Sequence, residues 1–195
     1  MSAKAATGLS ARERLLDAAN ELFYAEGVHT VGIDRVIERA GVAKASLYNT
    51  FGSKDELVRA YLEGRHARMA ARITAYIERY ADPRDKLLGI YEAQGELFAE
   101  PGYRGCAFVS ASAESPGEAV SRAVDDYRGW VRALFTALAS EAGAAEPERL
   151  ARQLHMIYDG ASLSTRMDRD PAAAANARAA AAVLLDAALA ARENA

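Results

Sequence analysis

Residues 32–54 have the sequence GIDRVIERAGVAKASLYNTFGSK and predict two short helices joined by a tight turn. The first half repeats apolar residues at helical spacing, and Gly41 then supplies a backbone that can turn with a positive φ angle. In the second half, Leu47 and Phe51 share one face of a helix that we expect to begin near Lys44. A short helix with small and hydrogen-bonding side chains, held by a preceding helix, suits the major groove of DNA. These residues therefore predict a helix-turn-helix that reads DNA.

The same stretch carries a longer motif, V-I-x-x-A-G-V-x-x-x-x-L-Y-x-x-F-x-S-K-x-x-L, which runs from Val36 to Leu57. With this motif the chain resembles the tetracycline-repressor family of bacterial transcription regulators over residues 10–65. One departure concerns Ala43, because the family usually has Ser or Thr there as the N-cap of the recognition helix. The missing hydroxyl removes a helix cap worth about 1 kcal/mol and one potential phosphate donor.

The resemblance implies an all-α protein of about nine helices arranged in two parts. An N-terminal three-helix DNA-binding domain is expected at residues 10–52, and a helical ligand-binding and dimerisation domain at residues 53–195. Residues 1–9 are expected to form a disordered arm. The composition agrees with a helical protein, because hydrophobic residues make up 51% of the chain and alanine dominates its later part.

Tyr48 and Lys54 are the strongest candidates for contacts with DNA phosphates. Members of the family contact phosphate through an aromatic residue at the position of Tyr48, and Lys54 lies where the positive N-terminus of a long helix would favour a phosphate. The alternatives are a tyrosine that packs within its helix and a lysine that is only solvated. The complete set of expected DNA contacts comprises Thr30, Arg35, Lys44, Ala45, Ser46, Tyr48, Asn49, Thr50 and Lys54.

Net charge is the main argument against a nucleic-acid partner. The chain carries a formal charge of −3, whereas a basic patch is the usual electrostatic footprint of a DNA-binding protein. Residues 1–65 contain nine basic and nine acidic side chains, so the predicted DNA-binding part is close to neutral. Binding is therefore expected to use local positive charge, to require a dimer and to weaken with salt.

Capping residues and prolines predict where the helices begin. Ser10 with Glu13, and Ser53 with Glu56, each form the pattern of a capping box. The second box is expected to open a long helix that extends to about Tyr80. Later helices are expected to begin at Pro83, after Cys106, near residues 115–118, at Pro147 and at Pro171, where Asp170 would be the cap.

Aromatic and polar side chains recur through the second part of the chain and suggest a small-molecule site. Such sites are largely apolar cavities with a few polar groups that orient the ligand. The alternative is that these side chains simply fill the core. With the family resemblance in view, the expected ligand contacts are His66, Tyr91, Gln94, Phe108, Trp130, His155 and Tyr158.

Cys106 is the single cysteine, which excludes an internal disulfide and fits a reducing cytoplasm. It follows Gly105 where a short helix is expected to begin, and a thiol at a helix N-terminus is more reactive toward electrophiles and oxidants. Some regulators similar to this one carry Gly-Cys at a corresponding place and sense reactive compounds through it. The alternative is a small residue buried for packing.

The last two helices are expected to form the interface of a homodimer, because small side chains permit close approach of helices. A two-fold dimer would present two recognition helices to a near-palindromic operator. The alternative is burial of both apolar stripes within one subunit. The stripes consist of Leu150, Leu154, Ile157, Tyr158 and Ala161, and of Ala177, Ala181, Leu184, Leu185, Ala188 and Leu189.

The expected function is a transcriptional repressor that a small-molecule inducer releases from its operator by a shift between conformations. An enzyme is not expected, because the three histidines are scattered and the chain has neither a nucleophile elbow nor a phosphate loop. No cofactor, metal or membrane partner is expected, since the sequence has no metal-ligand spacing, no signal peptide and no long uncharged apolar run. A redox-sensing repressor and a helical protein-interaction module are the alternative functions.

Overall fold

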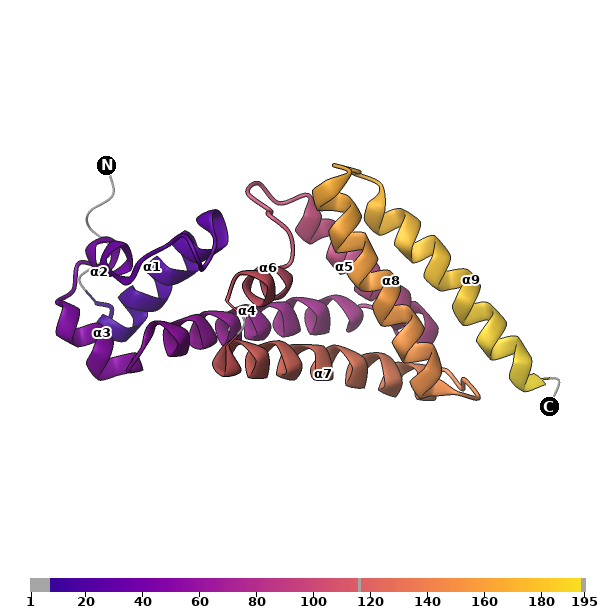
Figure 1. Cartoon of the computed structure of the whole chain (residues 1–195). Helices are drawn as coiled ribbons and strands as arrows, with labels where there is room; N and C mark the ends of the chain where they lie inside the picture. The colour runs from indigo at the N-terminus through magenta and orange to yellow at the C-terminus, as the bar shows by residue number, and fades with distance from the viewer. Residues whose placement is uncertain (1–7, 116, 194–195) are drawn as a thin grey trace. The chain divides into compact units, whose positions relative to one another are not determined.

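The computed structural model describes residues 8–115 and 117–193, and within these residues the chain forms nine α-helices and no strand (Figure 1). The all-α class predicted from the sequence is thereby confirmed. Of the predicted arm at residues 1–9, all but Gly8 and Leu9 lie outside the described residues. The helices are α1 (Ala11–Glu26), α2 (Ile33–Ala40), α3 (Lys44–Phe51), α4 (Lys54–Ile77), α5 (Pro83–Phe98), α6 (Ala107–Glu114), α7 (Glu118–Glu141), α8 (Pro147–Met167) and α9 (Ala173–Glu193).

The capping box predicted for α1 forms completely. The Ser10 hydroxyl accepts a hydrogen bond from the Glu13 amide at 3.2 Å, and the Glu13 carboxylate accepts one from the Ser10 amide at 2.8 Å. These bonds lower the pKa of Glu13, because they favour its charged form. The helix ends at Glu26, and Gly27 is its C-cap.

The box predicted for the long helix α4 forms only in part. The Ser53 hydroxyl accepts a hydrogen bond from the Glu56 amide at 3.1 Å. The Glu56 carboxylate does not return to the cap, because it accepts a hydrogen bond from Arg59 Nε at 2.7 Å instead. An arginine three residues later on the same helix face therefore competes with the reciprocal cap.

The later helix starts agree with the prolines except at α9. Asp82 caps α5 by accepting a hydrogen bond from the Arg84 amide at 2.8 Å, and α8 begins at Pro147. The expected start of the last helix at Pro171 is wrong by two residues. Asp170 accepts a hydrogen bond from the Ala172 amide at 2.8 Å, which closes a turn around the proline before the helix begins.

The chain divides into two compact units, of which the first contains the residues up to His66 together with Ala107–Asp125. The second contains Ala67–Cys106 and the residues from Asp126 onward. This division differs from the sequence expectation of a boundary at residue 53. The reason is that α4 and α7 are long helices and each passes from one unit into the other.

The first unit has a core in which α1 contacts both α2 and α3. The ring of Phe23 in α1 meets Tyr61 in α4 edge to face, with 5.7 Å between ring centroids. The guanidinium of Arg65 lies 3.5 Å from the centre of the Tyr24 ring, which adds a cation–π contact between the same two helices. The first part of α4 is therefore part of the core of the first unit. The fully buried side chains of this core include Leu15, Val36, Leu47, Leu57 and Leu62.

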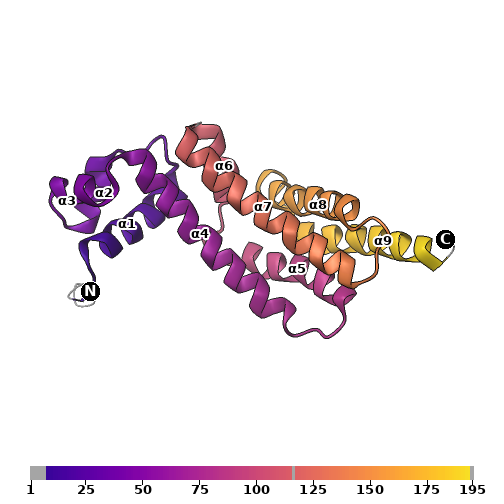
Figure 2. The ribbon, with the colours of Figure 1, turned by 90° about the horizontal axis from the view of Figure 1, so that it is seen from below.

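In the second unit α5, α8 and α9 lie side by side, as both ribbon views show (Figures 1 and 2). Tyr91 and Phe135 are fully buried there, with 6.1 Å between their ring centroids. Two ion pairs connect α9 to α5, one from Arg178 Nε to Glu92 at 2.6 Å and one from Arg84 to Asp186 at 2.7 Å. By length and composition residues 173–190 of α9 could cross a membrane, but the helix packs on α5 and α8 instead.

Candidate nucleic-acid interface and small-molecule pocket

The turn between α2 and α3 is held from α1 by a side chain that sequence patterns do not reveal. Gly41 adopts the left-handed conformation predicted for it, with φ of 62°. Arg14 Nη1 donates hydrogen bonds to the carbonyl oxygens of Gly41 at 3.1 Å and Ala40 at 3.4 Å. A cation at these carbonyls offsets the negative end of α2. Because the partners are 27 residues apart, no local pattern could pair them.

Helix α3 presents opposite environments on its two sides. Leu47 is fully buried, whereas the adjacent Tyr48 keeps 44% of its surface exposed. Lys44, Ala45, Asn49 and Thr50 are exposed as well, and Ser46 is half-buried. The helix is thus anchored by one face and offers polar side chains on the other, which is the arrangement a groove-reading helix needs.

Two of the expected DNA-contacting cations are already paired with carboxylates. Arg35 donates two hydrogen bonds to Glu26, at 2.6 and 2.9 Å, and Lys44 donates one to Asp34 at 2.9 Å. These hydrogen bonds raise the pKa of Arg35 and of Lys44. A DNA phosphate would therefore have to share or replace the carboxylate at either side chain.

Three further expected contacts differ in how available they are. Lys54 is the first residue of α4 and is half-buried, and Thr30 is exposed in the segment between α1 and α2. The Thr50 hydroxyl donates a hydrogen bond to the Ser46 carbonyl oxygen at 2.6 Å. Its proton is used within the helix, so Thr50 could meet DNA only as an acceptor.

The N-terminus of α3 lacks a side-chain cap, as expected from Ala43. Ala43 has the extended backbone of an N-cap, and no side chain bonds the first amides of the helix. We expect Ala43→Ser to raise the free energy of unfolding by about 1 kcal/mol, because the hydroxyl can accept from an orphan amide. Urea unfolding followed by circular dichroism measures this gain. Ala43→Val should give none, and an equal gain with valine would contradict the capping explanation.

Helix α6 contacts the segment between α1 and α2 within the first unit. Its last residue, Glu114, accepts a hydrogen bond from the His29 amide at 3.1 Å. The same carboxylate lies so close to Gly27 that a Cβ atom there would be 2.5 Å from Oε2. The contact joins residues 85 positions apart, and sequence reasoning did not anticipate it.

Five of the seven expected ligand contacts lie in the second unit. Tyr91, Gln94, His155 and Tyr158 are buried in the second unit, where Trp130 is half-buried. The Tyr91 hydroxyl donates to the Leu154 carbonyl oxygen at 2.8 Å, and Gln94 Nε2 donates to the Tyr158 carbonyl oxygen at 2.9 Å. His66 and Phe108 belong to the first unit. As ligand contacts all seven stay a prediction.

The buried polar groups of the second unit are held in their neutral forms. Burial raises the pKa of Tyr91, Tyr127 and Tyr158, and it lowers the pKa of His155. The carboxylate of Asp159 lies 3.6 Å from His155 Nε2 and opposes that shift, but it is also paired with Arg128 at 2.9 Å. Burial therefore favours the uncharged form of each of these side chains.

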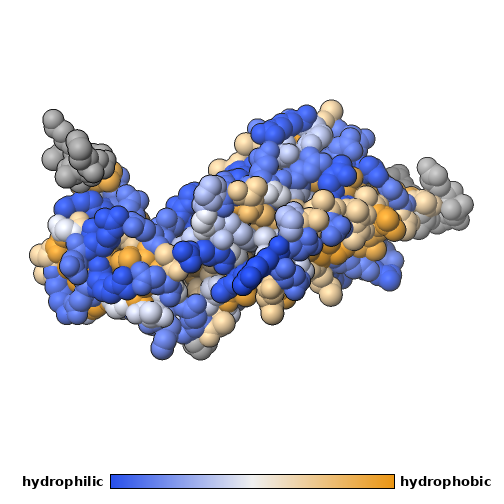
Figure 3. All heavy atoms as spheres, turned by 90° about the horizontal axis from the view of Figure 1, so that it is seen from above, coloured by the Kyte–Doolittle hydropathy of each residue, from blue (hydrophilic) through white to orange (hydrophobic). Residues whose placement is uncertain are grey.

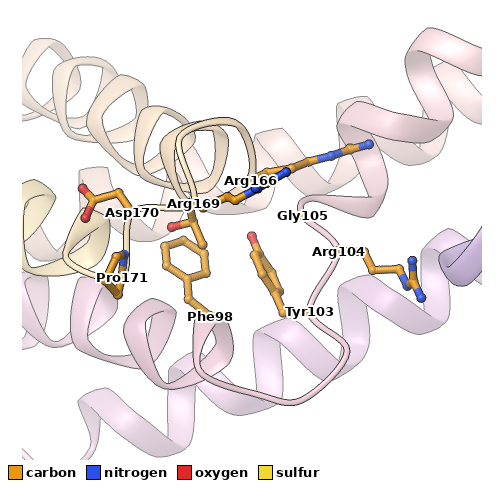
Figure 4. Close-up of a pocket in the computed structure, with 9 residues that line it drawn as sticks. Phe98, Tyr103, Arg104, Gly105, Arg166, Arg169, Asp170 and Pro171 are labelled. Carbon is orange, nitrogen blue, oxygen red and sulfur yellow. The ribbon is translucent and has the colours of Figure 1, made fainter.

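A pocket of about 390 Å³ lies elsewhere in the second unit (Figure 4). It is formed by the end of α5, the loop before α6 and the turn from α8 to α9. None of the seven expected ligand contacts lines it. The lining residues are Phe98, Tyr103, Arg104, Gly105, Thr165, Arg166, Arg169, Asp170 and Pro171.

Cys106 is half-buried and directly precedes α6, whose predicted start is confirmed. The residue before it, Gly105, lines the pocket. A reactive thiol at Cys106 stays a prediction.

The apolar stripes expected to form the dimer interface are mostly buried within the single chain. Leu150, Leu154, Tyr158 and Ala161 of α8 are buried, and so are Ala177, Ala181 and Leu185 of α9. These residues pack inside the chain, where α9 contacts both α8 and α5, and a dimer through the last two helices stays a prediction. A different apolar face is exposed over the C-terminal helices (Figure 3), and its large members are Met156, Leu163, Met167 and Val183.

Known proteins with a similar sequence or structure are transcriptional regulators. The family profile "Bacterial regulatory proteins, tetR family" matches residues 15–61. The repressor NemR of Escherichia coli is 29% identical over 169 residues, which cover 81% of this chain and 85% of NemR. The activator FasR of Mycolicibacterium smegmatis is 37% identical over 82 residues, but the match spans only 37% of FasR.

Solved structures extend the likeness to the whole chain. The crystal structure of SCO4454, a TetR-family regulator from Streptomyces coelicolor, has a TM-score of 0.84 and 34% identity. That match covers 92% of this chain and 96% of SCO4454. The reduced form of E. coli NemR has a TM-score of 0.77 at 28% identity. With the helix-turn-helix built from α2 and α3 and this agreement over nearly the full length, the chain belongs to the TetR family of DNA-binding transcriptional regulators.

Proposed function

We propose that this protein is a dimeric repressor that binds a near-palindromic operator in the bacterial cytoplasm and is released by a small molecule. The observation that carries the DNA-binding part is helix α3, with Leu47 buried and Tyr48 exposed on a turn held by Arg14. Repression is favoured over activation because the match to the repressor NemR spans 81% of the chain, against 42% for the activator FasR. The relatives are regulators rather than enzymes.

The DNA contacts follow from the exposed face of α3 and the start of α4. Tyr48 and Lys54 would contact phosphates, and Asn49, Ala45 and Lys44 would lie against base edges or the backbone. Phosphate contacts position a protein on DNA, and groove contacts supply sequence preference. Ser46, Thr50, Thr30 and Arg35 complete the proposed set.

The dimer would form through the exposed apolar face of α8 and α9. Met156 and Met167 keep 74% and 70% of their surface exposed, and Val183 keeps 72%. Large apolar side chains at such exposure on two packed helices are typical of a surface that is covered by a partner. A second copy is the occupant that a two-fold operator requires, since half-sites about 34 Å apart demand two recognition helices.

Release would pass along α6, which follows the pocket loop in the chain and contacts the segment between α1 and α2. The loop residues Tyr103, Arg104 and Gly105 line the pocket, and α6 begins two residues later. At its other end Glu114 bonds the His29 amide, next to the proposed phosphate contact Thr30. A ligand that prefers the released arrangement by several kcal/mol, about 5 for a complete switch, would empty the operator.

We expect Glu114→Ala to loosen the contact between α6 and the segment between α1 and α2. Loss of one exposed hydrogen bond, worth about 1 kcal/mol, should speed exchange of the His29 amide roughly fivefold. Hydrogen exchange measured by NMR tests this. Glu114→Gln keeps an acceptor oxygen and should exchange at nearly the original rate. Unchanged exchange in both variants would contradict the coupling.

The proposed function is tested by selecting bound DNA from a random pool and titrating the recovered site with the purified protein. We expect a near-palindrome, and a binding constant whose logarithm falls linearly with the logarithm of salt concentration. Scrambling one half-site should abolish tight binding. If no sequence is enriched and no duplex binds at low salt, the protein would instead be a helical interaction module.

A further inference from the structure

We propose that the pocket between the end of α5, the loop before α6 and the α8–α9 turn binds a small aromatic carboxylic acid. Its volume of about 390 Å³ is near the lower end of the range for small-molecule sites, roughly 300–1,000 Å³. A ligand with one or two rings would therefore fill it. Neither the family likeness nor the residues expected from the sequence assign a ligand to this place.

The charge of the lining favours an anion. Three arginines, Arg104, Arg166 and Arg169, line the pocket, against the single carboxylate of Asp170. That carboxylate is engaged outside the pocket, since it accepts hydrogen bonds from the Ala172 amide at 2.8 Å and from Asn176 Nδ2 at 3.5 Å. A guanidinium can hold a carboxylate through two parallel hydrogen bonds, which a neutral ligand cannot match.

Arg169 is the cation best placed for this task. Within residues 8–115 and 117–193 it has no ion pair, unlike the arginines of the DNA-binding face. It is also the only described residue other than glycine with a positive φ angle, 55°. Glycine is the residue usually found at such a position after a helix C-terminus, because a Cβ is unfavourable there. An arginine that tolerates this backbone is a candidate for a functional side chain.

The aromatic part of the ligand would lie against Phe98 and Tyr103. Their rings stand side by side in the pocket (Figure 4), with 4.9 Å between centroids and 43° between planes. Flat rings pack well on such a pair in offset or tilted geometry. The pocket also needs room for the side chain of Arg166. Gly105 provides it, because a Cβ atom there would lie only 2.8 Å from Arg166 Cδ. Glycine there lets the Arg166 side chain rest on the backbone.

The regulatory consequence of binding rests on the proposed function, but binding itself does not. The acid would contact the loop that leads into α6, so its occupancy could bias the contact between Glu114 and His29. Binding of the acid is measurable without DNA. A protein that does not bind the acid can therefore be distinguished from a protein that does not bind an operator.

The test is calorimetric titration of the full chain with benzoate, salicylate, cinnamate and 1-naphthoate, each beside its neutral amide. We expect at least one acid to bind, and to bind about tenfold or more tightly than its amide, because one charge-assisted contact accounts for at least that factor. Arg169→Gly should weaken binding of the acid by a similar factor. It should also raise the midpoint of thermal unfolding by about 2–4 °C, because glycine readily adopts the positive φ angle at this position. Arg169→Lys should retain part of the affinity.

Arg122→Gln is the matched control, because it removes one exposed guanidinium from α7. It should leave the affinity for the acid unchanged. The proposal would be overturned if an acid and its amide bound equally well, or if Arg169→Gly bound the acid as tightly as the unmodified protein. It would also be overturned if none of the four acids gave a heat of binding at millimolar concentration. Operator affinity of Arg169→Gly without acid should equal that of the unmodified protein. If the protein bound the acid but no operator, the proposed function would be refuted and the proposal about the pocket would remain supported.

Discussion

Replacing both Leu163 and Val183 with glutamate is expected to give a folded monomer that binds operator roughly a hundredfold more weakly, or worse. Leu163 is 53% exposed and Val183 72% exposed, so neither substitution should disturb the core of the second unit. In a two-fold dimer each would place like charges opposite one another in an apolar contact. A monomer loses the second half-site, and with it the gain from bivalent attachment.

Sedimentation velocity measures the oligomeric state, and circular dichroism with thermal unfolding reports whether the helices persist. The double change Ala133→Glu with Ala137→Glu is the matched control, because it adds the same two charges at exposed positions of α7. The control should remain dimeric and keep its operator affinity. A double variant that still sediments as a dimer would show that the interface lies on another face. Thermal unfolding of the double variant could also abolish operator binding. The operator affinities are therefore compared well below the midpoint of its thermal unfolding.

Two neighbouring residues of α3 should give opposite results when each is changed to alanine. Leu47 is fully buried, so Leu47→Ala should destabilise the DNA-binding unit by about 3 kcal/mol through lost burial and a residual cavity. Tyr48 is 44% exposed, so Tyr48→Ala should leave stability nearly unchanged. Its operator affinity should fall about tenfold to a hundredfold, because each dimer loses two contacts.

Urea unfolding and operator titration on both proteins separate the two effects. Tyr48→Phe is the informative control, since it removes only the hydroxyl and keeps the ring. We expect it to weaken binding by less than Tyr48→Ala and to leave the dependence on salt unchanged, because a neutral hydroxyl releases no counterions from DNA. Unchanged operator affinity in Tyr48→Ala would remove the exposed face of α3 from the DNA interface.

Local signals were sufficient for the helix-turn-helix and for most helix boundaries. The Ser10 capping box, the glycine turn at Gly41 and the prolines at 83 and 147 each act within a few residues of the chain. The exceptions are also local. Glu56 bonds Arg59 rather than the Ser53 amide, and Pro171 sits in a turn before α9, because two nearby partners compete for the same group.

Contacts between distant segments could not be predicted in the same way. Arg14 bonds carbonyl oxygens at the C-terminal end of α2, and Glu114 bonds the His29 amide 85 residues earlier. The pocket combines residues near positions 100 and 167, so its three arginines share no sequence pattern. The residues expected to bind ligand are aromatic and polar side chains of the second part of the chain, and such side chains suit a buried core as well as a ligand site.

The sequence by itself determined that the protein is helical, that α2 and α3 form a DNA-reading pair, and that Tyr48 faces outward beside a buried Leu47. These properties depend on apolar spacing and turn residues, which operate over one or two helical turns. Only the tertiary structure decided which face of α8 and α9 is free and where the pocket lies. Helix α9 carries alanine and other apolar residues on all its sides, so its periodicity cannot distinguish the face that packs on α5 and α8 from the face that is left for a partner.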